Sequence, residues 1–380
     1  MSTSTAYAGN AGSDHDASEL QIIRFSDDRC RKIRIGKERK LRTGEANQDI
    51  ETLKIVGRAL AVMMAVCMVM VLLTSCRASE EKVMQNKKLQ VATSLFPLYD
   101  FARNIGQDRA DVFLLLPPGV EAHSFEPRPD DMVRLNRADV FIYTSSAMEP
   151  WAADVLRGVR NRDLKVIESG RGIAMLAGHE EHSHGKQEGR RHVADERRPD
   201  QGGGDPHIWL DFSNAAAMVD NILAGFIEKD PLNRAFYERN ADAYKAKLYD
   251  LDRRFKDGLS RCRKNVIVHG GHFAFGYLAQ RYGLRYVAVS GFSPNAEPTA
   301  SGMVRISKVL KANDLRYLFY EELLSPRVAE SLARETGVSL LMLNAAHNVG
   351  KEEFERGIGF LDLMQRNLEN LKRGLACPQP

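Results

Sequence analysis

Short apolar runs alternate with helix-like segments along most of this chain, beginning at Leu89. In the first half, runs of strand length lie at 89–95, 110–116, 140–146 and 165–169, each followed by helical periodicity or a loop. Strands that alternate with helices indicate βαβ units and a mainly parallel sheet. Unbroken apolar runs such as FLLL at 113–116 fit strands buried on both faces.

The alternation stops and then restarts around one long helical stretch. A helix is expected to open at Pro231 and to continue to about Cys262, with apolar residues at i, i+3 and i+4. With nearly thirty residues, this helix would be about 45 Å long, which is enough to connect two lobes. Four further strand runs follow, at 265–270, 285–291, 315–321 and 339–344, and a final amphipathic helix is expected from Lys351 to Leu375.

We therefore predict an α/β protein with two lobes, each with a mainly parallel β-sheet flanked by helices, joined by one long rigid helix. The length of 380 residues fits two domains of about 150 residues better than one. The predicted parts are an N-terminal lobe at 89–229, a linking helix at 230–263 and a C-terminal lobe at 264–376. Within the first lobe, residues 170–206 are polar, charged and rich in Gly, which predicts a loop.

An uncharged apolar run from Ala59 to Leu73 predicts a targeting segment. It is shorter than the roughly 20 residues of a membrane-spanning helix and fits the apolar region of a signal peptide. The sequence LTSC at 73–76 resembles the cleavage box of bacterial lipoproteins, which implies a signal peptide at 54–76, lipidation of Cys76 and a tether at 77–88. The alternative is a short anchor helix that is never cut, and both interpretations place residues 77–380 outside the cytoplasm.

Residues 1–53 precede this segment and include a basic arm, RCRKIRIGKERKLR, at 29–42. We interpret them as a disordered leader or as the result of a start codon placed too early. A cytoplasmic patch for nucleic acid or anionic lipid is the alternative. The formal net charge of +4 does not suggest a nucleic-acid partner, and five scattered Cys are too few for a disulfide scaffold.

Histidines recur where predicted strands end. His123, His272 and His347 each follow a strand, and His207 lies where a loop enters a helix. Ligands of open α/β sheets bind beyond the carboxyl ends of the strands, so a cleft between the lobes could collect these side chains. Because imidazole is a preferred ligand of zinc, a metal site is expected there.

Four stretches then carry a specific resemblance: PPGVEAHSFEPRPDD, DPHIWLD, HFAFGYLAQRYGL and FYEELLSPRVAESLARETGV. With the lipoprotein box and a His-rich loop, they make residues 88–375 resemble the metal-binding lipoproteins of bacterial ABC transporters for zinc and manganese, especially the zinc-uptake branch. The resemblance implies a monomer, not an enzyme, anchored by lipid on the extracytoplasmic face of the cell membrane. It would capture Zn²⁺ between its lobes and deliver it to a permease driven by an ATPase.

The resemblance also implies the ligands. His123, His207 and His272 match the first three metal-binding positions of the family. Many members place an Asp at the fourth position, in a Leu-Asp segment, where this chain has Leu343 and Asn344. The fourth ligand could therefore be His347, Asn344, Glu121, Glu321 or a water, although Glu321 could instead pair with Arg128. His269 is interpreted as a structural neighbour of His272.

Three imidazoles favour zinc, because manganese sites favour carboxylate oxygens; a manganese-binding protein of the same family is the alternative. The loop residues His179, His182, His184 and His192 fit an auxiliary low-affinity zinc collector, or else a polar insertion without a function.

Two other classes of function are alternatives to metal transport. The loop contains HEEH, one residue short of the HExxH motif, so a zinc-dependent hydrolase is an alternative. A surface adhesin is the third class, and no sequence feature favours it.

Overall fold

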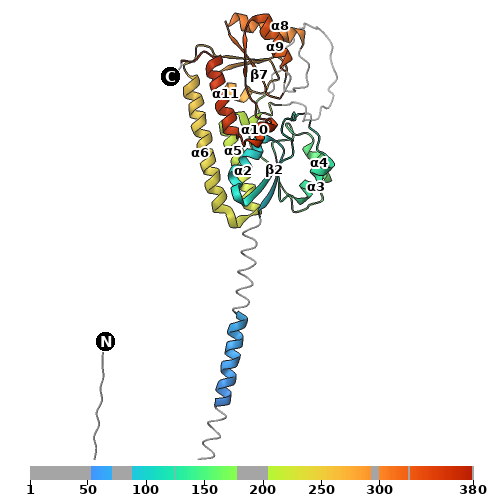
Figure 1. The fold of residues 1–380 in the computed structure, drawn as a ribbon, viewed down its shortest axis with the longest axis vertical. Helices are drawn as coiled ribbons and strands as arrows, with labels where there is room; N and C mark the ends of the chain where they lie inside the picture. The colour runs from blue at the N-terminus through green and yellow to red at the C-terminus, as the bar shows by residue number, and fades with distance from the viewer. Residues whose placement is uncertain are drawn as a thin grey trace, which may run out of the picture. The chain divides into compact units, whose positions relative to one another are not determined.

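The structure, a computed structural model, describes residues 53–70, 88–123, 125–177, 204–291, 299–323 and 326–378. The chain divides into two units, at 1–81 and 82–380. In the first unit the described residues form one exposed helix, Leu53–Met70, which is long and apolar enough to cross a membrane and is compatible with a signal peptide (Figure 1). The predicted lipidation site, Cys76, lies outside the described residues.

The second unit begins with a four-stranded parallel sheet. Its strands are β1 (Leu89–Thr93), β2 (Ala110–Leu114), β3 (Val140–Tyr143) and β4 (Lys165–Glu168), in the order β2-β1-β3-β4. The helices of this lobe are α2 (Phe96–Gly106), α3 (Pro129–Arg137), α4 (Ala152–Gly158) and α5 (Phe212–Lys229), with short 3₁₀ turns η1 (Gln107–Arg109) and η3 (Ile208–Leu210). The apolar strand β3 is buried from Val140 to Ile142, as expected of a strand covered on both faces.

The second lobe repeats this arrangement. Its strands β5 (Val266–His269), β6 (Arg285–Ala288), β7 (Tyr317–Tyr320) and β8 (Ser339–Met342) are all parallel, in the order β6-β5-β7-β8. Its helices are α7 (Gly276–Arg281), α8 (Ala300–Ala312), α9 (Arg327–Thr336), α10 (Lys351–Glu355) and α11 (Phe360–Gly374). The predicted fold class, two parallel sheets flanked by helices in two lobes, is confirmed.

One long helix, α6 (Arg234–Leu259), joins the lobes (Figure 1). Its 26 residues span about 39 Å. It is shorter than predicted because Pro231–Asn233 forms a separate 3₁₀ turn, η4. Tyr244 on this helix donates a hydrogen bond to Asp100 of α2, 2.8 Å away, and Asp100 also accepts one from the backbone of Phe360 at the start of α11.

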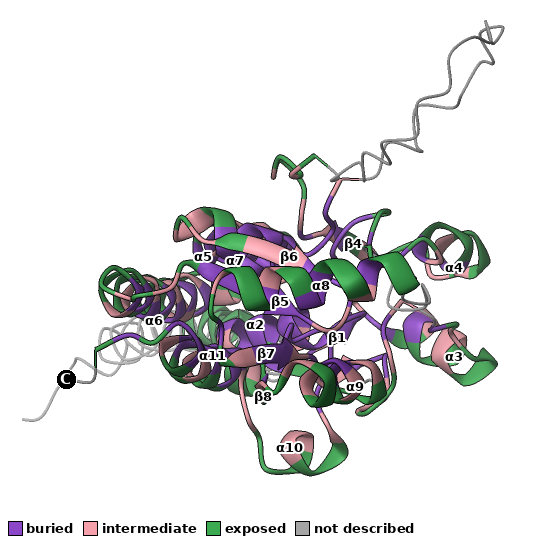
Figure 2. Ribbon diagram, turned by 90° about the horizontal axis from the view of Figure 1, so that it is seen from above, coloured by how far each residue is buried: buried purple, intermediate pink, exposed green. Residues whose placement is uncertain are grey.

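The core is continuous between the lobes. Residues of α2, α5, α6 and α11 belong to a single buried apolar cluster, seen as the purple interior in Figure 2. The ring of Phe101 on α2 packs against Tyr244 on α6 and Phe360 on α11, with ring centroids 5.6 and 5.2 Å apart. Because α6 and α11 pack on the first lobe, the two sheets are held in a fixed relation around the space between them.

The prediction of one continuous helix from Lys351 to Leu375 is wrong. It is divided into α10 and α11 by the segment between Glu355 and Phe360. Gly357 in that segment has a φ of 70°, a left-handed conformation that interrupts a right-handed helix and that glycine adopts most easily.

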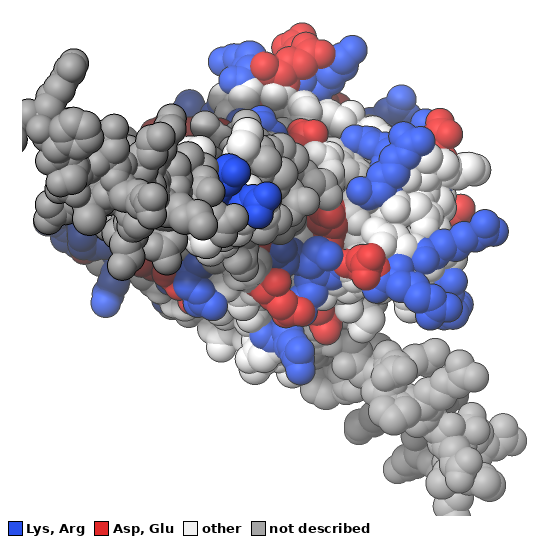
Figure 3. All heavy atoms as spheres, turned by 90° about the horizontal axis from the view of Figure 1, so that it is seen from below, with Lys and Arg blue, Asp and Glu red and all other residues white. Residues whose placement is uncertain are grey.

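Charges of both signs mix on the surface. Over the described part of the face in Figure 3, Lys and Arg lie among Asp and Glu. A broad basic surface, the usual footprint of nucleic-acid binding, is therefore not seen on that part of the face.

A disulfide joins Cys262, just after α6, to Cys377, just after α11. The two residues are 115 positions apart in the sequence, so their spacing gave no sign of the pairing. The bond ties together the ends of two helices that already pack side by side. Disulfides persist in oxidising compartments, which agrees with a protein outside the cytoplasm.

Replacing both cysteines, in Cys262→Ser with Cys377→Ser, is expected to lower the free energy of unfolding by about 2–4 kcal/mol, because the bond restricts the unfolded chain over a long loop. Urea titrations of both proteins, with and without a reductant, measure the effect. The reductant should lower the stability of the wild type to that of the variant. A wild type that is insensitive to reduction would contradict the pairing.

Candidate metal centre

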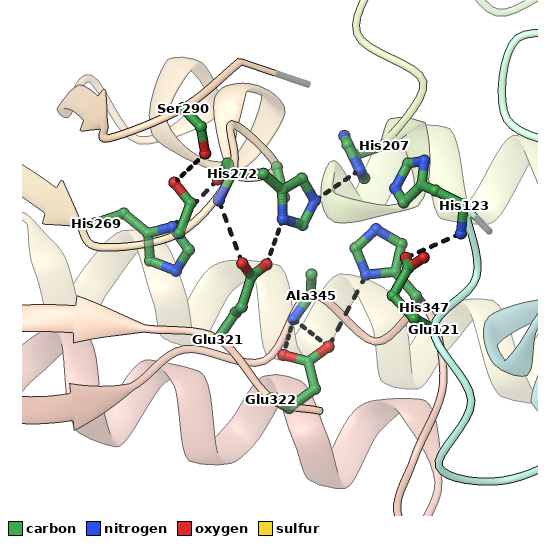
Figure 4. Close-up of polar contacts among 12 residues, drawn as sticks. Glu121, His123, His207, His269, His272, Ser290, Glu321, Glu322, Ala345 and His347 are labelled. Atoms are coloured by element: carbon green, nitrogen blue, oxygen red, sulfur yellow. Dashed lines mark hydrogen bonds and ion pairs between the residues drawn. The ribbon is translucent and has the colours of Figure 1, made fainter. Parts of the chain in front are cut away.

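Four histidines from both lobes meet between the two sheets. His123 lies in the segment after β2, His207 immediately before η3, His272 after β5 and His347 after β8. One possible ligand nitrogen from each lies within 4.8 Å of the others, and the rings face one another in Figure 4. Since parallel strands present their carboxyl ends at one edge of each sheet, the fold brings these distant residues together.

Asp205 fixes the orientation of His207. Its Oδ1 atom accepts a hydrogen bond from the backbone N–H of His207 at 3.0 Å and lies 2.7 Å from the ring Nδ1. The Nδ1–H is thereby directed to the carboxylate, which leaves Nε2 to point into the cluster. This Nε2 lies 3.4 Å from the Nε2 of His272. Trp209 packs edge-on against the rings of His207 and His347, with centroids 5.6 and 5.4 Å apart.

Glu321, at the end of β7, orients His272 in the same way. Its carboxylate pairs with Nδ1 of His272 and accepts a hydrogen bond from the backbone N–H of that residue at 3.2 Å. Burial raises the pKa of Glu321, but its hydrogen bonds with His272 and its electrostatic interactions with His272 and His269 together bring the pKa below its usual value. Glu321 thus orients His272 and does not itself belong to the group of four histidines. Arg128, its suggested partner, is exposed at the start of α3.

The segment after β8 brings His347, and not Asn344, into the cluster. Asn344 Oδ1 accepts a hydrogen bond from the backbone N–H of Ala346 at 2.7 Å. This local turn accompanies a left-handed φ of 60° at Ala346, after which the His347 ring faces the other imidazoles. The amide oxygen of Asn344 therefore shapes the turn.

Glu121 is also outside the group of four histidines. Its carboxylate accepts a hydrogen bond from the backbone N–H of His123 at 2.9 Å.

Sequence reasoning missed Glu322. Its carboxylate accepts hydrogen bonds from the backbone N–H of Ala345 at 2.9 and 3.1 Å, and Oε1 lies 3.9 Å from Nδ1 of His347 (Figure 4). Burial, with a smaller effect of the nearby Glu321, raises the pKa of Glu322 to about 8. The sequence signal for Glu322 is the pair of adjacent glutamates, Glu321 and Glu322, at the end of the predicted strand 315–321.

Three of the four imidazoles, those of His123, His207 and His347, are held neutral, the form that binds metal. Burial is the main cause, and it lowers the pKa of His123 to about 4 and the pKa values of His207 and His347 well below the usual 6.5. Among the described residues, the buried Nε2 atoms of His123 and His347 have no hydrogen-bond partner. Four imidazole nitrogens that lie within 4.8 Å of one another fit a divalent cation such as Zn²⁺.

The remaining histidines named in the sequence analysis are not part of the group of four. His269, at the end of β5, is fully buried outside the cluster, with Nδ1 3.2 Å from the backbone oxygen of His272. It therefore supports the backbone of a cluster residue. His179, His182, His184 and His192, together with the HEEH sequence, lie outside the described residues.

Comparison with known proteins agrees with this geometry. Residues 91–374 match the family described as "Zinc-uptake complex component A periplasmic". The chain belongs to this family. It is similar to the high-affinity zinc uptake system protein ZnuA of Bacillus subtilis, with 34% identity over 288 residues that cover 76% of this chain and 88% of that protein. It is 33% identical to the zinc-binding lipoprotein AdcA of Streptococcus pneumoniae over 75% of this chain, but spans only 56% of that longer relative.

Solved structures show the same two-lobe fold. The Zn(II)-bound ZnuA-like domain of Streptococcus pneumoniae AdcA matches with a TM-score of 0.63 and 31% identity, over 76% of this chain and 99% of that one. The laminin-binding protein Lmb of Streptococcus agalactiae, described as bifunctional with adhesin and metal transporting activity, matches with a TM-score of 0.64 and 26% identity, over 76% and 99% of the two chains.

The depressed pKa of His123 predicts a pH effect on the metal-free protein. Between about pH 6.5 and the folded pKa of about 4, the unfolded chain binds the proton and the native state does not. The group therefore destabilises the native state as the pH falls. His123→Gln removes this effect, so the variant should gain stability relative to the wild type by up to about 1.4 kcal/mol per pH unit below pH 6.

Urea titrations at pH 8, 6 and 5, in the presence of a chelator, measure this difference. Comparison with the variant is essential, because buried carboxyls with raised pKa values, such as Glu149 and Asp205, act in the opposite direction in both proteins. Parallel pH dependences for the two proteins would contradict a His123 that is neutral at mildly acidic pH.

Proposed function

We propose that this protein captures Zn²⁺ outside the cytoplasm, at the centre formed by His123, His207, His272 and His347, and delivers it to a membrane transporter. The observation that carries the proposal is the convergence of four imidazoles within 4.8 Å, two of which have buried Nε2 atoms without a partner among the described residues. An ion at their centre would satisfy all four nitrogens at once.

The donor set supports zinc over manganese. Every cluster donor is an imidazole nitrogen, whereas manganese favours carboxylate and water oxygens. The nearby carboxylates of Asp205 and Glu321 are engaged with ring nitrogens behind the cluster. Four protein ligands also complete a tetrahedral shell, while catalytic zinc keeps one position open, so the arrangement favours binding over hydrolysis.

The protein would deliver Zn²⁺ to an ABC permease and its ATPase, as the family resemblance implies. It would act as a monomer that is held at the membrane. Lipidation of Cys76 after the apolar helix Leu53–Met70 would supply the anchor. The Cys262–Cys377 disulfide supports an extracytoplasmic location. The four histidines between 178 and 193 would act as a weak auxiliary zinc collector.

A zinc titration with manganese as competitor tests the proposal. The wild type should bind one Zn²⁺ tightly and prefer it to Mn²⁺, and the double variant His123→Ala with His272→Ala should lose the tight site. His347→Ala should weaken binding about 10-fold or more, because one of four ligands is removed. Asn344→Asp should retain affinity close to the wild type, since its carboxylate can still accept the hydrogen bond from Ala346.

Isothermal calorimetry with a competing chelator measures these affinities. Circular dichroism of each metal-free variant controls for folding. Tight binding that survives in the double variant would overturn the site, and a preference for Mn²⁺ would overturn the choice of metal. If His347→Ala bound zinc as the wild type does, the fourth ligand would be another group.

A further inference from the structure

The turn that carries His347 belongs to the second lobe by sequence but is also bonded to the first lobe. The backbone oxygen of His347 accepts a hydrogen bond from the N–H of Phe96 at 3.1 Å, and that of Ala345 accepts one from Nε1 of Trp209 at 2.8 Å. Gly119, in the segment after β2, donates its N–H to the oxygen of Val349 at 2.8 Å. The position of His347 is thus set by the lobe that supplies His123 and His207.

Asn348 makes the most direct link between two of the cluster segments. Its Nδ2 group donates to the backbone oxygens of Pro117 and Val120, at 2.7 and 2.9 Å, while its Oδ1 accepts from the N–H of Val349 at 2.9 Å. Pro117 and Val120 form the turn that leads into His123. The amide therefore joins the segment of His123 to the residue next to His347.

The position of Asn348 requires a particular set of hydrogen-bond donors and acceptors. Asn348 is completely buried, so its amide group must find its hydrogen-bond partners within the protein. A short side chain with two N–H donors and one acceptor is needed, which describes asparagine. An aspartate of the same shape would place oxygens against two backbone oxygens.

We propose that Asn348 is a positioning residue for the zinc centre: by tying the turn of Pro117 and Val120 to the turn of His347, it fixes the separation of His123 and His347. The two rings have centroids 5.2 Å apart. The inference rests on the proposed zinc site, because it assigns a role in that site to a residue that does not contact the ion. Without this side chain, the bond from the N–H of Gly119 to the oxygen of Val349 would still join the two turns, but the two imidazoles would be held less firmly in place for the same ion.

Cobalt substitution of the full chain, kept in mild detergent, tests this role together with zinc affinity. Tetrahedral Co²⁺ absorbs visible light strongly, and the absorption weakens when water enters the shell. Asn348→Ala should bind zinc about 10–100-fold more weakly, the range for residues that orient metal ligands, and its cobalt form should lose visible intensity. Asn348→Asp should be affected at least as strongly.

Asn221→Ala is the matched control. The Nδ2 group of Asn221 also bridges two backbone oxygens, of Ser169 and Arg171, at 2.8 and 3.0 Å, but neither belongs to a segment that carries a cluster histidine within the described residues. This variant should keep both the affinity and the spectrum of the wild type. If Asn348→Ala does not fold, Asn348→Ser, which keeps one donor, should show an intermediate loss.

The outcomes separate the two proposals. A wild type that binds neither Zn²⁺ nor Co²⁺ at a tight site would refute the proposed function. A wild type that binds both metals, with a folded Asn348→Ala or Asn348→Ser variant of equal affinity and unchanged cobalt absorption, would refute the positioning role alone. A fall in melting temperature without a change at the metal would show that Asn348 is merely structural.

Discussion

Burying several imidazole rings against one another is the constraint on which the rest of this structure depends. Such rings must be neutral, and each needs an environment that directs one nitrogen inward. Burial keeps the pKa values of His123, His207 and His347 low. The carboxylates of Asp205 and Glu321 take up the outer nitrogens of His207 and His272, so the inner nitrogens meet.

The fold supplies this arrangement by repeating one topology. Each lobe orders its four parallel strands in the same way, and the carboxyl ends of the strands lead into the segments that carry the cluster. The helices α6 and α11, together with the Cys262–Cys377 disulfide, hold the lobes in one continuous core.

The sequence alone predicted the alternation of strands and helices, because period and length are local properties. It also singled out the four histidines that meet, since each follows a strand or enters a helix. It left His347, Asn344, Glu121, Glu321 and a water open as the fourth ligand. The placement of His347 in the cluster follows a turn in which the amide oxygen of Asn344 accepts a hydrogen bond from Ala346, and this bond could not be read from the sequence. The pairing of Cys262 with Cys377 and the role of Glu322 were missed for a similar reason. Both depend on how α11 and β7 pack, which no local pattern encodes.

The coordination of zinc itself tests the central claim most directly. X-ray absorption spectroscopy of the full chain, loaded with one equivalent of Zn²⁺, reports the number and type of ligand atoms. Four nitrogen neighbours at about 2.0 Å, with the outer-shell scattering of imidazole, are the predicted result. A shell dominated by carboxylate or water oxygens, or a six-coordinate ion, would contradict a centre made of four histidines.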